Sequence, residues 1–110
     1  MRVLIIILFF ISGPITAQAP IDLALDTYND RSVPYISVED LYKNKDGYLI
    51  IDTRKKKEFL VSHIPNAVWG GEKLDASAFA KAYPDKSKPI VVYCSIGVRS
   101  ENFGESLQKL

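Results

Sequence analysis

The sequence predicts a single α/β domain built around a mainly parallel β-sheet. Two short apolar runs without polar alternation, Tyr48–Ile51 and Ile90–Tyr93, are typical of strands buried on both faces. Segments with helical periodicity lie before, between and after these runs, and such alternation is the pattern of a parallel sheet with helices packed against it. With 110 residues, 47% of them hydrophobic and 25% charged, the chain has room for one small globular domain.

The first residues have the composition of an export signal. Arg2 is followed by an unbroken apolar run over residues 3–11 and then by a Ser-Gly-Pro break and small residues. We expect a signal peptide over residues 1–17, cleaved after Ala17, and a periplasmic or secreted mature protein. The run is far shorter than the ~20 apolar residues that span a bilayer, and tethering by an uncleaved N-terminus is the alternative. Residues 18–34 show no clear period and form a lead-in to which we assign no function.

Before the first strand, the sequence predicts a short helix that begins with a capping box. Ser37 supplies a side-chain oxygen for an orphan amide of the first turn, and Asp40 stands three residues later. The helix is expected to end near Lys45. Asp46-Gly47 then makes the turn into the strand Tyr48–Ile51.

Between the two apolar strands we expect a short helix, a short strand over Ala67–Trp69 and a second helix. The second helix begins after a cap at Asp75. Beyond the strand that ends at residue 93, Phe103, Leu107 and Leu110 lie at i, i+4 and i+7 and are expected to form one apolar face of a last helix.

Charge and ligand spacing exclude several classes of function. The chain carries 14 basic and 13 acidic residues, and loss of the predicted signal removes only Arg2 and leaves 13 of each. Such a balance does not favour nucleic acid as a partner. No group of His, Cys and acidic residues has metal-ligand spacing, so we expect no metal and no bound cofactor.

Cys94, the only cysteine, follows the strand Ile90–Tyr93. A lone cysteine in an exported domain forms no intramolecular disulfide and is either a buried apolar side chain or a reactive thiol. Between a strand end and a helix start it faces unpaired amides and the positive end of the helix dipole, which lower the pKa of a thiol. Gly97 permits a positive φ that turns successive amides toward one point, and Arg99 supplies a guanidinium for an oxyanion. The pattern predicts a nucleophile in an anion-holding loop.

Three segments of the chain resemble the rhodanese (thiosulfate sulfurtransferase-like) domain family. They are the loop over residues 94–100, Asp52-Thr53-Arg54 with Glu58-Phe59, and residues 62–67, which are similar to the family's GHIPGA segment. The resemblance covers about residues 35–110 and implies a three-layer fold with helices on both faces of a central, mainly parallel sheet. It also implies a sulfurtransferase whose loop cysteine takes the outer sulfur of a donor such as thiosulfate, holds it as a persulfide and passes it to a thiophilic acceptor.

By this resemblance Cys94 is the sulfur carrier, and Arg99 positions an anionic donor. The substrate-binding loop would comprise Ser95, Ile96, Gly97, Val98 and Arg99. The supporting residues would be Asp52, Arg54, Glu58, His63 and Ser100. The expected partners are a small anionic sulfur donor and a thiophilic acceptor, either a small molecule or a protein thiol, with no nucleic acid and no stable membrane span.

Some of these side chains have simpler structural interpretations. His63 precedes Ile64-Pro65 and is expected to fix a turn rather than to act as an acid or base. Asp52 and Arg54 are expected to form an ion pair or hydrogen bonds that hold the strand end. The run of lysines over residues 55–57 is interpreted as a solvated helix face, with anion steering as the alternative.

Loop length separates two chemistries on this fold. Four residues stand between Cys94 and Arg99, whereas the related phosphatases have five, so the spacing favours sulfur transfer over phosphate ester hydrolysis. A catalytically idle binding or sulfur-sensing module of the same fold is the remaining alternative. Asn66 stands where the family usually has glycine, at a left-handed position that asparagine tolerates. The family's domain continues into a further strand and helix beyond the position of Leu110, so the sequence predicts a C-terminally incomplete domain.

Overall fold

The computed structural model describes residues 20–110, which fall into two contact units divided between Asp30 and Arg31. In the described part of the first unit, residues 20–28 form a helix within the segment that the sequence assigned as a lead-in. Its last turn is held by Thr27 Oγ1, which donates to the carbonyl of Leu23 at 2.6 Å. The expected signal peptide lies outside the described residues. Over residues 20–110, no helix has both the length and the apolar character needed to cross a bilayer.

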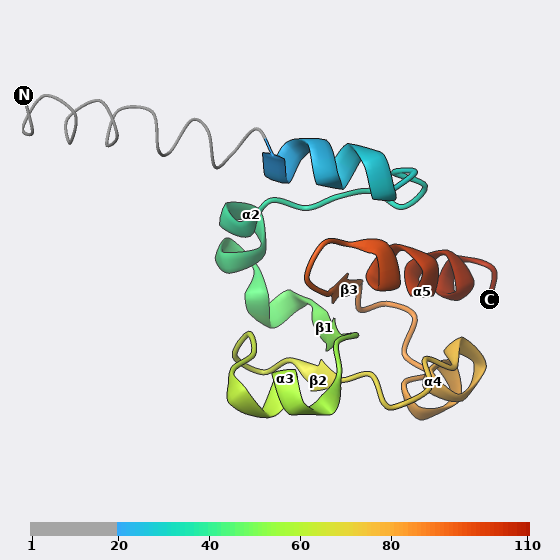
Figure 1. Ribbon diagram of the computed structural model, residues 1–110. Helices are drawn as coiled ribbons and strands as arrows, with labels where there is room; N and C mark the ends of the chain where they lie inside the picture. The colour runs from blue at the N-terminus through green and yellow to red at the C-terminus, as the bar shows by residue number, and fades with distance from the viewer. Residues whose placement is uncertain (1–19) are drawn as a thin grey trace, which may run out of the picture. The chain divides into compact units, whose positions relative to one another are not determined.

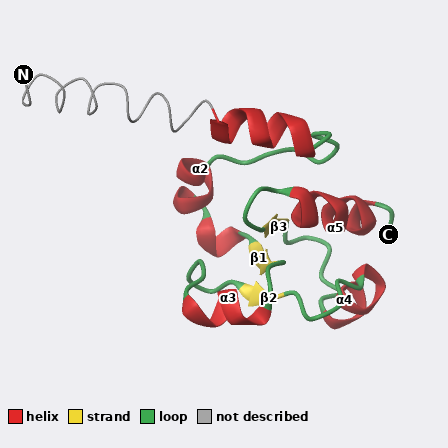
Figure 2. Ribbon diagram, in the orientation of Figure 1, coloured by secondary structure: helices red, strands yellow, loops and turns green. Residues whose placement is uncertain are grey.

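The second unit is built on a sheet of three parallel strands, β1 (Leu49–Asp52), β2 (Val68–Trp69) and β3 (Ile90–Tyr93). Their order is β2-β1-β3, with Ile51 opposite both Val68 and Val92. The strands lie at the centre of the unit, with helices around them (Figure 2). The predicted α/β class with a parallel sheet and flanking helices is confirmed.

Four α-helices and one 3₁₀ turn accompany the sheet in this unit (Figure 1). They are α2 (Val38–Lys43), the 3₁₀ turn (Lys45–Gly47), α3 (Lys56–Val61), α4 (Ala76–Ala82) and α5 (Val98–Gln108). Ser37 and Asp75 cap α2 and α4 as predicted, each accepting a backbone N–H three residues later, at 3.1 and 3.0 Å. Each cap satisfies an amide that the first helical turn leaves without a partner.

One face of the sheet carries the main hydrophobic core. Side chains alternate along a strand, so Leu49 and Ile51 share a face, and Ile51 packs in a buried cluster with Phe79 of α4 and Phe103 of α5. The two phenyl rings meet edge to face, with centroids 5.9 Å apart and planes at 88°. Val92 of β3 packs against the same cluster, so α4 and α5 are fixed against this face by apolar burial.

The opposite face of the sheet is more polar. Asp52 and Tyr93 lie opposite each other in the register, and the Tyr93 hydroxyl donates to Asp52 Oδ2 at 2.8 Å. The same hydroxyl accepts the backbone N–H of Ile64 at 3.1 Å. The turn after α3 is therefore anchored to the carboxyl ends of β1 and β3.

Two sequence-based expectations about elements are corrected. Leu110 is 55% exposed and does not extend the apolar face of α5, because the helix ends at Gln108 and its regular side-chain spacing ends there. The first helix ends at Lys43 rather than near Lys45, since the chain tightens into the 3₁₀ turn. Phe103 and Leu107 occupy the core as predicted.

Candidate active site around Cys94

Cys94 is the first residue after β3, and the loop that follows leads into α5. Thr53, the residue after β1, fixes the end of β3. Its N–H and its hydroxyl both donate to the Tyr93 carbonyl, each at 2.9 Å. Gly97 ends the loop as the N-cap of α5 with φ 88°, the left-handed conformation that the sequence predicted. The thiol thus starts from a fixed strand end and faces a helix N-terminus.

The Sγ atom of Cys94 lies within the loop that it begins. The Gly97 N–H donates to Sγ at 3.1 Å, and Ser100 Oγ lies 3.4 Å from Sγ. Ser100 Oγ also donates to the Gly97 carbonyl at 3.0 Å, which ties the first turn of α5 back to the loop. Ser100 is buried and Cys94 half-buried, so the side chain predicted to support the loop contacts the sulfur directly.

The surroundings of Cys94 favour its thiolate. Burial raises the pKa of the thiol, because a charged sulfur loses hydration there. Hydrogen bonds from the Ser100 hydroxyl and from the backbone of Ser100, Gly97 and Ile96 lower the pKa by more than burial raises it. The net effect is a Cys94 pKa below that of an ordinary thiol, as expected for a sulfur at a helix N-terminus.

Asp52, which is buried, forms an ion pair with the half-buried Arg54 at the end of β1. Arg54 Nη2 donates to Asp52 Oδ2 at 2.7 Å and Nε to Oδ1 at 3.0 Å, and Nη2 also donates to the Ser62 carbonyl at 2.7 Å. Although burial raises the pKa of Asp52, its hydrogen bonds with Arg54 and Tyr93 bring it below the usual carboxyl value. Asp52 in turn raises the pKa of Arg54. The predicted strand-end pair is confirmed, and it extends through Asp52 to Tyr93, the residue next to Cys94.

His63 and Glu58 interact with α3 rather than with the loop. His63 Nδ1 lies 2.8 Å from the Phe59 carbonyl, and its ring stacks on that of Phe59 with centroids 3.8 Å apart. Glu58 accepts the Lys55 N–H at 3.1 Å, at the start of α3. His63 therefore contacts the end of α3 by a hydrogen bond and a ring contact, in keeping with the turn-fixing role expected from the sequence. Asn66 has φ 67°, the left-handed value expected where the resembled family has glycine.

Arg99 lines an open cleft of about 620 Å³ that lies beside the loop. Its other basic lining residues are Arg54, Lys55, Lys56 and Lys57. Ser95, Ile96 and Arg99 are exposed. The lysine run that the sequence assigned to a solvated helix face is exposed, and it also shares a cleft with the arginine of the loop.

Sequence reasoning missed two side chains that make long-range contacts next to the loop in the chain. Tyr93 was assigned only as a strand residue, yet its hydroxyl joins Asp52 to the turn after α3. Glu101, in the first turn of α5 and 6% exposed, accepts the Arg31 N–H at 3.0 Å and the Tyr35 hydroxyl at 2.9 Å. Glu101 stands between Ser100 and Asn102 in the sequence, and these polar neighbours give no signal for its contacts with Arg31 and Tyr35.

The fold and the loop define a class: an α/β protein that presents a thiol at the carboxyl end of a parallel strand and the N-terminus of a helix. The family model of the rhodanese-like domain matches residues 37–110, and the chain belongs to the rhodanese-like domain family. No curated protein and no solved structure matches the chain. Among residues 20–110, no cluster of three or more His, Cys, Asp or Glu side chains could hold a metal ion.

Proposed function

We propose that the protein is a sulfurtransferase that carries a sulfane sulfur as a persulfide on Cys94. The hydrogen-bonding environment of Cys94 Sγ carries this proposal. Sγ accepts the N–H of Gly97 at 3.1 Å and lies 3.4 Å from Ser100 Oγ. These donors stabilise a negative sulfur without a histidine base. The outer sulfur of a persulfide would be bonded to this Sγ, next to the same loop.

The first half-reaction loads the sulfur. The Cys94 thiolate attacks the outer sulfur of thiosulfate, the new Sγ–S bond forms, and the bond to the sulfonate sulfur breaks. Sulfite leaves with the electron pair of that bond, and the protein retains a persulfide anion. Arg99, exposed next to the loop, is the cation that would attract the departing and arriving oxyanions.

The second half-reaction returns the thiolate. The acceptor thiol attacks the outer sulfur of the persulfide, its proton passes to that sulfur, and the Sγ–S bond breaks. Cys94 leaves as a thiolate, which the loop amides stabilise. With four residues between Cys94 and Arg99, the loop is a smaller ring than the five-residue loop of the related phosphatases, which supports transfer of a sulfur atom over that of a phosphoryl group.

Turnover with thiosulfate and cyanide tests the proposal. We expect thiocyanate to form with the full mature protein and to be abolished in Cys94→Ser. Arg99→Gln should raise the KM for thiosulfate more than it lowers kcat, because the guanidinium binds the donor rather than the reacting sulfur. Thiocyanate formation that survives Cys94→Ser would refute Cys94 as the carrier.

We also propose that the protein acts after export. The support is the sequence of residues 1–17, with its basic start, apolar run and small residues before Gln18. N-terminal sequencing of the protein from the periplasm or the medium should begin at Gln18. A protein that retains Met1 in the membrane fraction would favour the tethered alternative.

A further inference from the structure

The cleft beside the loop has more positive charge than a small donor requires. Five of its nine lining residues are basic and one, Glu72, is acidic. Arg54 is already paired with Asp52, whereas Lys55, Lys56 and Lys57 are exposed. The cleft therefore keeps an excess of positive charge after its internal ion pair is counted.

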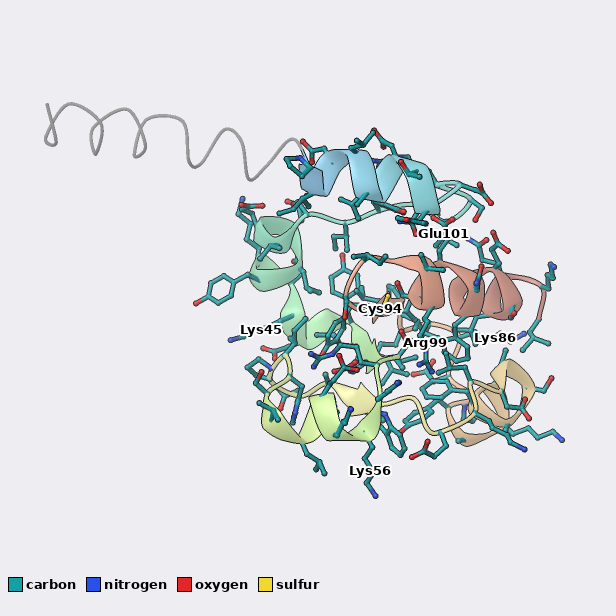
Figure 3. All side chains as sticks on the ribbon, in the orientation of Figure 1. Lys45, Lys56, Lys86, Cys94, Arg99 and Glu101 are labelled. Carbon is teal, nitrogen blue, oxygen red and sulfur yellow. The ribbon has the colours of Figure 1, made fainter. Side chains whose placement is uncertain are left out.

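The positive groups are spread over two elements rather than gathered around one point. Lys56 and Lys57 belong to the first turn of α3, Lys55 precedes them, and Arg99 belongs to the first turn of α5. Figure 3 labels Lys56 and Arg99 on these two helices. Thiosulfate is a compact dianion. A volume of about 620 Å³ lies in the range of sites for much larger ligands.

The wall of the cleft also carries apolar surface. Leu60 is 69% exposed there, and the half-buried Trp69 presents its ring to Lys56, whose Nζ lies 5.6 Å from the ring centroid. Trp69 Nε1 donates to the Arg54 carbonyl at 2.9 Å, which fixes the indole in the wall. A ligand for this cleft therefore combines separated negative charges with some apolar surface, which describes an acidic stretch of polypeptide.

We propose that this cleft docks an acidic segment of the protein that carries the acceptor thiol. The inference rests on the proposed sulfurtransferase function and names its acceptor. Carboxylates of the segment pair with Lys55, Lys56 and Lys57. Arg99, which belongs to the Cys94 loop, also lines the cleft. The acceptor thiol, held next to this docked segment, attacks the outer sulfur of the Cys94 persulfide and takes it up as described above.

The test compares two acceptor peptides of equal length, each with one cysteine, flanked by glutamates in one and by glutamines in the other. Full mature protein is loaded with thiosulfate, freed of donor, and mixed with each peptide in a single turnover. Three exposed lysine–carboxylate pairs are each a weak contact, and together they should make transfer to the glutamate peptide about tenfold faster at low salt. High salt should remove this advantage.

Two triple variants separate the cleft from general charge. Lys55→Gln, Lys56→Gln and Lys57→Gln together should slow transfer to the glutamate peptide about tenfold and leave the glutamine peptide unchanged. The matched variant Lys45→Gln, Lys86→Gln and Lys88→Gln removes the same charge from exposed positions outside the cleft and should retain the fast transfer. Here each peptide is compared between the wild type and the variants, so differences in thiol pKa between the two peptides cancel.

Equal transfer to both peptides, or an equal loss in both triple variants, would overturn the docking proposal while leaving sulfur loading intact. If Cys94 takes up no sulfur, a thiol-free glutamate peptide is titrated against Cys94→Ser, with the fluorescence of Trp69, the only tryptophan, as the readout. Binding that depends on the three lysines would support the cleft as a docking site for acidic polypeptide. It would refute the transfer of sulfur from Cys94 to the docked protein. Tighter binding of a single-stranded oligonucleotide than of the glutamate peptide would overturn the acidic polypeptide as the ligand.

Discussion

Replacing Ser100 with alanine should reduce the thiolate population of Cys94 about fivefold at a pH below the titration midpoint. Ser100 Oγ lies 3.4 Å from Sγ and 3.0 Å from the Gly97 carbonyl, and its hydroxyl has one proton to donate. Beside a thiol, Ser100 donates to Gly97 and accepts from the S–H. Beside a thiolate, its proton has two competing acceptors.

The size of the effect follows from this competition. A hydrogen bond to a charged group contributes about 1.5–3 kcal/mol and one to a neutral group about 0.5–1.5 kcal/mol. Turning the Ser100 proton from the Gly97 carbonyl to the thiolate therefore favours the thiolate by about 1 kcal/mol. Because 1.36 kcal/mol corresponds to a factor of ten, the loss in Ser100→Ala is about fivefold.

The assay is the ultraviolet absorbance of the Cys94 thiolate as a function of pH, with Cys94→Ser as the blank. Wild-type protein should titrate below an ordinary thiol, and Ser100→Ala at higher pH than wild type. Ser106→Ala is the matched control, because Ser106 also donates to a carbonyl of α5, that of Asn102 at 3.1 Å, and is exposed. An unchanged midpoint in Ser100→Ala, or an equal shift in Ser106→Ala, would refute the role given to the hydroxyl.

Three further predictions concern the framework of the site. Tyr93→Phe should lower the free energy of unfolding by about 1–3 kcal/mol in urea melts, because the Ile64 N–H and the Asp52 carboxylate each lose a hydrogen bond. Tyr42→Phe, at a residue that is 72% exposed, should leave the free energy of unfolding unchanged. Equal stabilities of the two variants would contradict this prediction. Gly97→Ala should lower the free energy of unfolding by about 1–2 kcal/mol, because the φ of Gly97 is 88°. Gly47→Ala should leave stability unchanged or increase it, since its Cβ would meet no atom within 4 Å. If Gly47→Ala were the more destabilising variant, the loop would not be held in this conformation. The lowered pKa of Asp52 contributes stability that is complete above the unfolded carboxyl pKa of about 3.9 and is lost as pH falls through the folded value. Asp52→Asn should therefore reduce the loss of unfolding free energy that accompanies falling pH. An unaltered dependence on pH would refute a contribution of Asp52 to acid sensitivity.

Local chemistry explains the parts of the fold that the sequence predicted. The strands around Ile51 and Val92 are continuous apolar runs, and the caps at Ser37 and Asp75 act within three residues. Gly97 is the residue type that a left-handed loop position prefers. Each of these signals is readable over a few neighbouring residues, so no knowledge of tertiary contacts is needed.

The features that escaped prediction depend on residues distant in sequence. The Tyr93–Asp52 hydrogen bond joins positions 41 residues apart, and the Tyr35–Glu101 bond joins positions 66 apart. The cleft that brings the lysine run to Arg99 likewise forms only when α3 and α5 are placed around the sheet. A run of three lysines looks the same in sequence whether or not an arginine and a tryptophan face it, which is why the solvated interpretation was the simpler one.

The most direct measurement of the central claim is the intact mass of the full mature protein after a single exposure to thiosulfate. The mass should increase by one sulfur, located on Cys94, and this sulfur should leave as thiocyanate when cyanide is supplied. Cys94→Ser should gain none, and Ser106→Ala should gain sulfur as the wild type does. A folded protein whose Cys94 gains no sulfur, or a Cys94→Ser protein that gains one, would contradict the claim that this loop carries sulfur on its cysteine.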